Sequence, residues 1–273
     1  MKKTAPFLLF LLVFAACKES GDTKTTTPQN AAKPIPTIKY ELLARFPHDS
    51  SLFTEGLLVH QGQLFESTGS PEGLPNTESM IGVNNLETGM FEQKIKLDRS
   101  VYFGEGICIL KNKVYQLTYQ NQEAFVYHFP SFALAGKFKY SNKEGWGLTT
   151  DGTQLVMSDG TSQLSFIDPE TFRLVRSLPI TANGFAQNYL NELEYIKGYI
   201  YANIWMTNLI VKIDPKTGFI VGQIDMSPLV AEERKRKVNI DVMNGIAYDS
   251  AKNKVYVTGK LWTSIYEISF PYE

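Results

Sequence analysis

A glutamate between two glycines is the residue in this chain best suited to acid–base chemistry. Glu105 lies in Tyr102-Phe-Gly-Glu-Gly-Ile107, two residues after Phe103. A carboxyl group enclosed by aromatic rings is desolvated, which raises its pKa towards neutrality and lets it accept and return a proton. Glu105 is therefore the candidate general acid/base. The residues alone leave a second interpretation open, in which Gly-Glu-Gly forms a sharp turn and the glutamate caps a backbone group.

Four further segments resemble this one and follow each other at similar intervals. They are Phe53-Thr-Glu-Gly-Leu57, Gly145-Trp-Gly-Leu148, Leu190-Asn-Glu-Leu193 and Met243-Asn-Gly-Ile246. Counted between Leu57, Ile107, Leu148, Leu193 and Ile246, the intervals are 50, 41, 45 and 53 residues. Repetition at roughly 40 to 50 residues indicates a repeat architecture. The strand-like sequence between the segments predicts an all-β, five-bladed β-propeller.

The remainder of each repeat supplies the strands and turns of a blade. Asp151-Gly152 is one of five turns rich in Gly, Asn or Asp, which tolerate the positive φ of tight hairpins. The last repeat ends after its third strand, Ile265–Ser269, whereas the strand Ile38–Phe46 has no repeat before it. We expect this N-terminal strand to close the last blade as its outer strand, because closure removes an exposed sheet edge. Residues 38–273 would then form one domain.

The innermost strands of a propeller line a central channel, and ligands usually bind at one mouth of it. The repeated segments are predicted to be these strands or the loops that lead to them. Their side chains should therefore converge although they are distant in sequence, and Trp205 lies just after one segment. The expected set is Phe53, Glu55, Phe103, Glu105, Trp146, Asn191, Glu192, Trp205 and Asn244.

Two segments depart from the repeat plan. Gly69–Ser79 is a polar loop with two prolines. Residues 225–238 contain the charge run Ala-Glu-Glu-Arg-Lys-Arg-Lys237. We interpret the run as a solvated loop or short helix rather than as a basic binding surface.

Composition and motifs argue against several functions. The chain has 43% hydrophobic and 20% charged residues with a formal net charge of −1, which does not favour nucleic-acid binding. Its three histidines, His48, His60 and His128, lack metal-ligand spacing. Gly-x-Ser-x-Gly and phosphate-loop motifs are missing. Cys108 lies in an apolar stretch and is expected to be a buried, inert thiol.

The N-terminus is typical of an export signal. Lys2 and Lys3 precede an apolar run of about ten residues, which is too short for a mature transmembrane helix. The run ends in Phe14-Ala-Ala-Cys17, which resembles a bacterial lipoprotein cleavage site. We expect a signal peptide over 1–16, lipidation of Cys17, a flexible tether over 17–37, and attachment to the bacterial cell envelope. An ordinary signal peptide that happens to contain a cysteine is the alternative.

From about Ile38 to Tyr272 the sequence resembles the plant and bacterial glutaminyl-peptide cyclotransferases. Besides the repeated segments, the resemblance rests on Leu64-Phe-Glu-Ser-Thr-Gly69, Ser158-Asp-Gly-Thr161, Tyr201-Ala-Asn203, Ile213-Asp-Pro215 and Val257-Thr-Gly-Lys-Leu-Trp262. The resemblance implies a five-bladed propeller, in agreement with the five repeats. It also implies that the α-amine of an N-terminal glutamine attacks its own side-chain amide, forming pyroglutamate and releasing ammonia.

The resemblance further assigns site residues. Glu105 corresponds to the family's general acid/base, Asn191 to a side-chain amide that bonds the substrate, and Lys260 to a lysine that stabilises the oxyanion or orients the acid. The implied aromatic walls are Phe53, Phe103, Trp146 and Trp205.

Three departures from the family pattern concern the same pocket. Glu55 stands where plant members have glutamine, so it could raise the pKa of Glu105 or hold the substrate amine. Tyr119 replaces a pocket tryptophan. The Gly69–Ser79 loop is longer than in the compared family members and could cover the pocket mouth.

The residues leave two other functions open. One is a non-catalytic propeller lipoprotein that binds peptides or envelope components. The other is a metal-dependent lactonase-type propeller, with Glu55, Glu105, Asn191 and Asn244 around a cation. The cyclotransferase reading requires no cofactor and leaves a structural calcium ion open. Its expected partners are peptides or proteins with N-terminal glutamine, acted on by a monomer.

Overall fold

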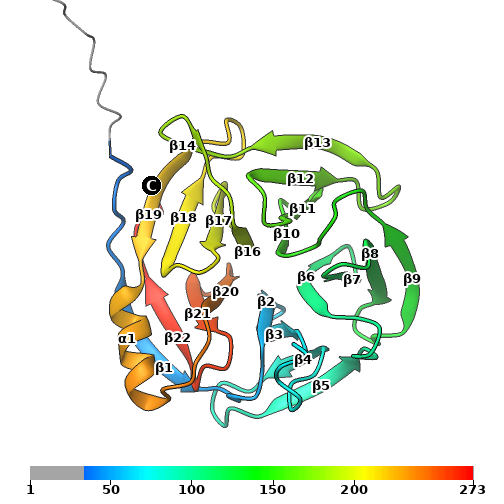
Figure 1. Cartoon of the computed structure of the whole chain (residues 1–273), viewed down its shortest axis with the longest axis horizontal. Coiled ribbons are helices and arrows are strands. Elements are labelled where there is room, and N and C mark those ends of the chain that lie inside the picture. The colour runs from blue at the N-terminus through cyan, green and yellow to red at the C-terminus, as the bar shows by residue number, and fades with distance from the viewer. Residues whose placement is uncertain (1–33, 273) are drawn as a thin grey trace, which may run out of the picture. The chain divides into compact units, whose positions relative to one another are not determined.

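Five four-stranded antiparallel sheets form a ring in the computed structural model, which describes residues 34–272 (Figure 1). The first blade contains β2 (Thr54–His60), β3 (Gln63–Thr68), β4 (Met80–Asn84) and β5 (Phe91–Lys96). The second contains β6 (Gly104–Leu110), β7 (Lys113–Thr118), β8 (Glu123–His128) and β9 (Leu134–Lys139). The third contains β10 (Leu148–Thr150), β11 (Leu155–Met157), β12 (Gln163–Ile167) and β13 (Leu174–Pro179).

The fourth blade contains β16 (Leu190–Ile196), β17 (Tyr199–Ile204), β18 (Leu209–Ile213) and β19 (Ile220–Asp225). A small hairpin, β14 (Thr181–Ala182) and β15 (Phe185–Ala186), precedes it. The fifth blade contains β20 (Met243–Asp249), β21 (Lys254–Gly259) and β22 (Ser264–Ser269), with β1 (Glu41–Pro47) as its outer strand. The antiparallel pairing of β1 with β22 confirms the predicted closure of the ring by the N-terminal strand.

The chain already contacts the propeller before β1. The Ile38 backbone N–H donates to the Gln223 carbonyl at 2.7 Å, and the Gln223 N–H donates to the Pro36 carbonyl at 2.9 Å. Residues 36–38 therefore run along β19 of the fourth blade. The signal peptide, Cys17 and most of the expected tether lie outside the described residues.

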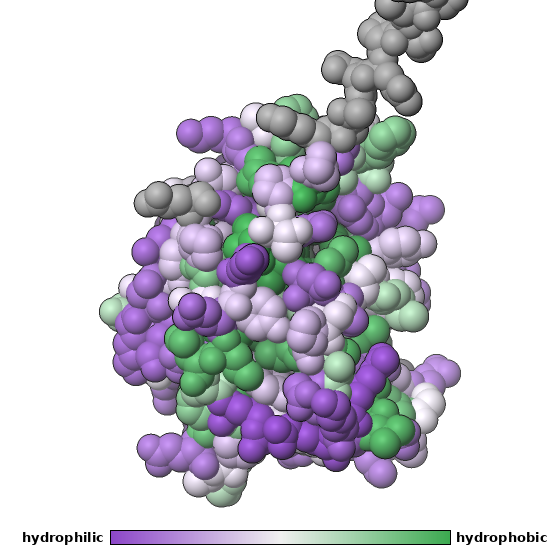
Figure 2. Space-filling model, turned by 90° about the vertical axis from the view of Figure 1, so that its left-hand side faces the viewer, coloured by the Kyte–Doolittle hydropathy of each residue, from purple (hydrophilic) through white to green (hydrophobic). Residues whose placement is uncertain are grey.

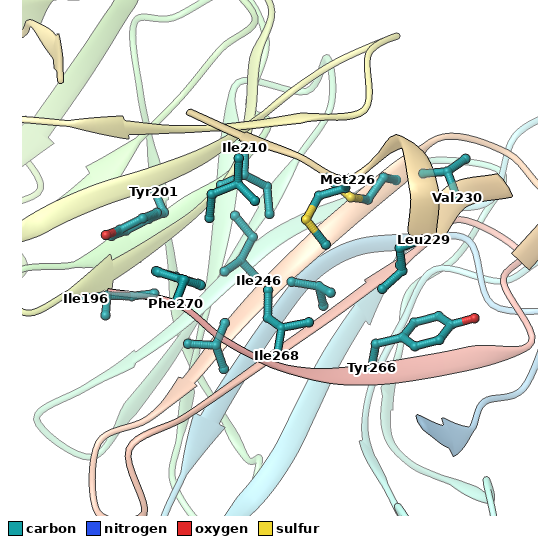
Figure 3. Close-up of a cluster of buried hydrophobic side chains, with 14 of the residues drawn as sticks. Ile196, Tyr201, Ile210, Met226, Leu229, Val230, Ile246, Tyr266, Ile268 and Phe270 are labelled. Carbon is teal, nitrogen blue, oxygen red and sulfur yellow. The ribbon is translucent and has the colours of Figure 1, made fainter. Parts of the chain in front are cut away.

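Most of the charge run between the fourth and fifth blades lies in the helix α1 (Ser227–Arg236), as the short-helix interpretation proposed. Leu229 and Val230 are buried in the hydrophobic cluster between these blades (Figure 3). Glu233 is also buried, and its carboxylate accepts hydrogen bonds from the Thr263 hydroxyl and the Tyr266 hydroxyl, both at 2.5 Å. These contacts fix α1 against the fifth blade.

The side of the ring that carries α1, β1 and β19 is mostly hydrophilic, with the most hydrophilic residues gathered at its lower end (Figure 2). The apolar residues of the blades pack instead in clusters between neighbouring sheets. Within residues 34–272, no helix is long and apolar enough to cross a membrane.

Irregular backbone pairing occurs where the innermost strands carry the repeated segments. The register shifts between Thr54 and Gly56 in β2 and between Gly104 and Ile107 in β6. Equivalent shifts occur in β16, between Leu190 and Leu193, and in β20, between Met243 and Ile246. A bulge redirects the side chains at that point of a strand. The glutamate or asparagine of these four segments therefore lies at a bulge rather than in regular alternation.

The glycine after the glutamate is required by close contact between neighbouring blades. A Cβ atom on Gly106 would lie 2.5 Å from the Leu148 backbone nitrogen and 2.6 Å from the Trp146 carbonyl oxygen. The Gly106 N–H donates to that same carbonyl at 2.7 Å. Because backbone meets backbone here, only a residue without a side chain fits.

Candidate active site

One cavity of about 300 Å³ contains all nine side chains that the sequence assigned to catalysis or substrate binding. They are Phe53, Glu55, Phe103, Glu105, Tyr119, Trp146, Asn191, Trp205 and Lys260. They come from all five blades or the loops beside them, so the ring brings together residues more than 200 positions apart. Two other expected members of the set, Glu192 and Asn244, do not line the cavity.

The walls of the cavity are aromatic. The Phe53 and Phe103 rings meet edge to face with centroids 6.3 Å apart, and Phe103 lies 5.8 Å from Tyr119. On the other side, Trp146 and Trp205 also meet edge to face, at 5.6 Å. Such walls exclude water and offer apolar surface to the methylene groups of a small ligand.

Two carboxyl groups and one ammonium group lie within this aromatic enclosure. The Glu105, Glu55 and Lys260 residues are only 5%, 2% and 6% exposed. Lys260 Nζ lies 2.7 Å from each carboxylate oxygen of Glu55 and 4.5 Å from the centre of the Phe53 ring. The Glu55 and Glu105 carboxyls share a side-chain hydrogen bond.

Burial is the main cause of the altered pKa values in this group. Burial raises the pKa of Glu105 well above its ordinary value, and the adjacent Glu55 carboxyl raises it further, against the opposing effect of Lys260. Burial also raises the pKa of Glu55 to about 7, while Lys260 limits that rise. Because the ammonium contacts Glu55 directly, it favours negative charge on Glu55 and leaves the proton on Glu105.

The backbone around Lys260 is fixed by the segment that follows α1. The Asp241 N–H donates to the Lys260 carbonyl, and the Lys260 N–H donates to the Val242 carbonyl, both at 2.9 Å. This pairing places Asp241 on the cavity wall, where its charge raises the pKa of Glu55. Sequence reasoning missed Asp241, although an acidic residue two positions before the Met243 segment was an available signal. It also missed Pro71 and Met206, which complete the lining.

Asn191 contributes an unused hydrogen-bonding group. Asn191 is 3% exposed, and its Oδ1 has no hydrogen-bond partner among residues 34–272. A buried polar atom without a partner costs free energy, so a ligand that supplies the missing bond is favoured. The side-chain amide of Asn191 can therefore bind an amide group of a ligand.

Asn244 and Glu192 support the site from outside the cavity. Asn244 Nδ2 donates to the Thr54 carbonyl at 3.0 Å and to Glu55 at 3.3 Å. The Glu192 carboxylate accepts the backbone N–H groups of Leu57 at 3.2 Å and Ile246 at 2.8 Å. Glu192 thus joins three inner strands, whereas Asn244 helps to orient Glu55.

The arrangement does not resemble the cation site that the lactonase-type alternative requires. In that alternative Glu55 would be a metal ligand, but both of its oxygens contact the Lys260 ammonium. Across residues 34–272, no group of three or more His, Cys, Asp or Glu side chains is placed to hold a metal ion.

The fold and the cavity together define a five-bladed propeller with paired acids in an aromatic pocket at its hub. A profile of the family described as glutamine cyclotransferase matches residues 11–270, and the chain belongs to this family. It is 41% identical over 230 residues to a glutaminyl-peptide cyclotransferase of Arabidopsis thaliana, covering 84% of this chain and 70% of the relative. The crystal structure of the glutaminyl cyclase of Myxococcus xanthus superposes with a TM-score of 0.79 at 33% identity, covering 87% of this chain and 98% of that one.

Proposed function

We propose that this protein is a glutaminyl-peptide cyclotransferase in which Glu105 is the general acid/base. Family membership and the two similar proteins support the activity. The observation that carries the catalytic assignment is the pair of hydrogen-bonded carboxyl groups, Glu55 and Glu105, buried in the aromatic cavity. Of two adjacent acids, the one with the higher pKa, Glu105, can donate a proton, and the one that ionises more readily, Glu55, can accept a hydrogen bond or a proton.

The reaction needs a folded substrate and two proton transfers. The neutral α-amine attacks the side-chain amide carbon of the same glutamine, which forms the C–N bond of the lactam. Protonated Glu105 gives its proton to the departing nitrogen, the C–N bond to that nitrogen breaks, and ammonia leaves. The carboxylate of Glu105 then takes one proton from the new ring nitrogen, so the enzyme returns to its starting state.

The other side chains hold the reacting groups in position. The aromatic walls confine the glutamine methylenes in a cyclic conformer, which lowers the entropic cost of ring closure. Asn191 hydrogen-bonds the scissile amide. Glu55, the more readily ionised of the two acids because it contacts Lys260, accepts a hydrogen bond from the substrate amine and keeps the proton on Glu105. Lys260 therefore acts by orienting and polarising the two acids.

The test is ammonia release from a peptide with N-terminal glutamine, measured with a chelator present. The wild type should produce one pyroglutamyl peptide per ammonia. Glu105→Gln should lower kcat by about 10²–10⁴-fold, the usual contribution of a positioned acid/base. The matched control is Glu92→Gln on the exposed face of β5, which should leave turnover unchanged. Wild-type turnover in Glu105→Gln would refute the assignment, and an inactive wild type would favour the binding-protein alternative.

A further inference from the structure

A second hollow adjoins the candidate active site on the side of the first and second blades. It measures about 560 Å³ and shares Pro71, Phe103 and Tyr119 with the catalytic cavity. Its other lining residues come from the long loop of the first blade, from the loop that joins the first blade to the second, and from the β7–β8 loop; they include Arg99, Ser100, Val101, Gln120 and Asn121. We call this hollow the side groove.

We propose that the side groove binds the peptide residues that follow the N-terminal glutamine, an inference that rests on the proposed function. The catalytic cavity, about 300 Å³, holds the cyclising residue. The remainder of a peptide substrate must leave through the mouth of the cavity. Pro71 and Tyr119 lie on the border between the cavity and the groove, so a chain that leaves over them enters the groove directly.

The side groove is chemically better suited to an extended peptide than the opposite rim of the catalytic cavity is. A peptide backbone needs hydrogen-bond partners when it is partly desolvated. The groove offers the exposed side-chain oxygens of Ser100, Gln120 and Asn121, whose donor groups already bond within the protein, as acceptors for peptide N–H groups. The opposite rim, on the fourth blade, carries the exposed apolar side chains of Tyr189 and Met206 beside Trp205.

Arg99 holds the loop that forms one wall of the side groove in place through hydrogen bonds. Its guanidinium donates to the Pro75 carbonyl at 2.6 Å, to the Thr77 carbonyl at 2.8 Å and to the Pro71 carbonyl at 3.4 Å. These bonds tie the Gly69–Ser79 loop to the loop that joins the first blade to the second. The loop therefore forms one wall of the groove, and its added length provides substrate-binding surface beside the mouth.

Variants that introduce a charge test whether the peptide leaves through the side groove or over the fourth blade. Val101 is 52% exposed and lines the groove without lining the catalytic cavity. kcat/KM is measured for Gln-Ala-Glu-Glu and Gln-Ala-Lys-Lys, each divided by the value for the dipeptide Gln-Ala. Val101→Lys should raise the acidic-to-basic ratio about two- to fivefold over wild type, and Val101→Glu should lower it similarly, as expected for exposed charge pairs. Both changes should shrink in 0.5 M salt.

The same substitutions at Tyr189, 54% exposed on the fourth blade, form the matched comparison. If Tyr189→Lys and Tyr189→Glu change the ratio and the Val101 variants do not, the peptide leaves over the fourth blade and the proposal is wrong. Unchanged ratios in all four variants also overturn it. Arg99→Met provides a second measurement, because release of the loop should lower tetrapeptide kcat/KM relative to the dipeptide. Lack of dipeptide turnover in the wild type would instead refute the proposed function itself.

Discussion

The Glu55–Lys260 pair lies in the interior of the ring and yields a prediction about stability and pH. Burial raises the pKa of Glu55 from its ordinary 4.5 to about 7, even though Lys260 Nζ lies 2.7 Å away. Desolvation therefore outweighs attraction, as is common for buried ion pairs. Below the ordinary pKa, Glu55 is neutral in the folded and unfolded states alike. As the pH rises towards 7, the unfolded chain releases this proton first, so the folded state loses stability.

The magnitude follows from the difference of 2.5 between 7 and 4.5. At about 1.4 kcal/mol per pKa unit, ionisation of Glu55 costs the folded state ~3 kcal/mol once the pH exceeds 7. Glu55→Gln removes this titration. We therefore expect the free energy of unfolding of the variant, relative to wild type, to increase by ~3 kcal/mol between pH 4.5 and pH 8.

Urea denaturation at several pH values measures this difference directly. Glu92→Gln on β5 is the control, because it makes the same substitution at an exposed glutamate. Taking the difference between variant and wild type cancels the contributions of buried acids that do not interact with Glu55, such as Glu194, whereas Glu105 stays coupled to the measured titration. If Glu55→Gln instead loses stability relative to wild type as the pH rises, the ion pair dominates burial and the reasoning fails.

Two further outcomes follow from the structure and a third from the sequence. Trp146→Ala should lower kcat/KM for a Gln-initiated dipeptide at least tenfold, since it removes the edge-to-face contact with Trp205 and opens the cavity wall, whereas unchanged kcat/KM would contradict an aromatic pocket. Gly106→Ala should reduce the free energy of unfolding by about 1–3 kcal/mol, because its Cβ would meet the Leu148 nitrogen at 2.5 Å; Gly73→Ala, with open space around its Cβ, is the control in the same denaturation assay. Cys17→Ser should move the protein from the membrane to the soluble fraction of expressing cells, and Cys108→Ser should not; equal partition of both variants would argue against the lipid anchor.

The fold was predictable from the sequence because each blade repeats the same local signals. Five similar segments such as Phe103-Gly-Glu-Gly-Ile107 marked the innermost strands, and hairpin turns such as Asp151-Gly152 marked the strand ends. The unpaired first strand and the missing last strand predicted the closure that β1 and β22 show. Short-range patterns sufficed here because propeller blades are built mainly from neighbouring strands.

The detailed chemistry of the pocket was less accessible. That Lys260 contacts both oxygens of Glu55 depends on how blades five and one meet, which no local pattern records. Asp241 was missed because it belongs to the irregular segment after α1 rather than to a repeated segment. The side groove likewise arises from three long-range bonds of Arg99 to a loop more than 20 residues earlier.

Glu105 and Glu192 show why residue type alone could not assign roles at the hub. Both are buried glutamates on bulged inner strands, and burial raises the pKa of each well above its ordinary value. The Glu192 carboxylate is occupied on both oxygens by backbone N–H groups of neighbouring blades, so it has a structural role. The side chain of Glu105 instead bonds to Glu55, which itself can gain or lose a proton. The identity of the partner, an immobile amide in one case and a titratable acid facing a cavity in the other, therefore decides which glutamate can exchange protons with a substrate.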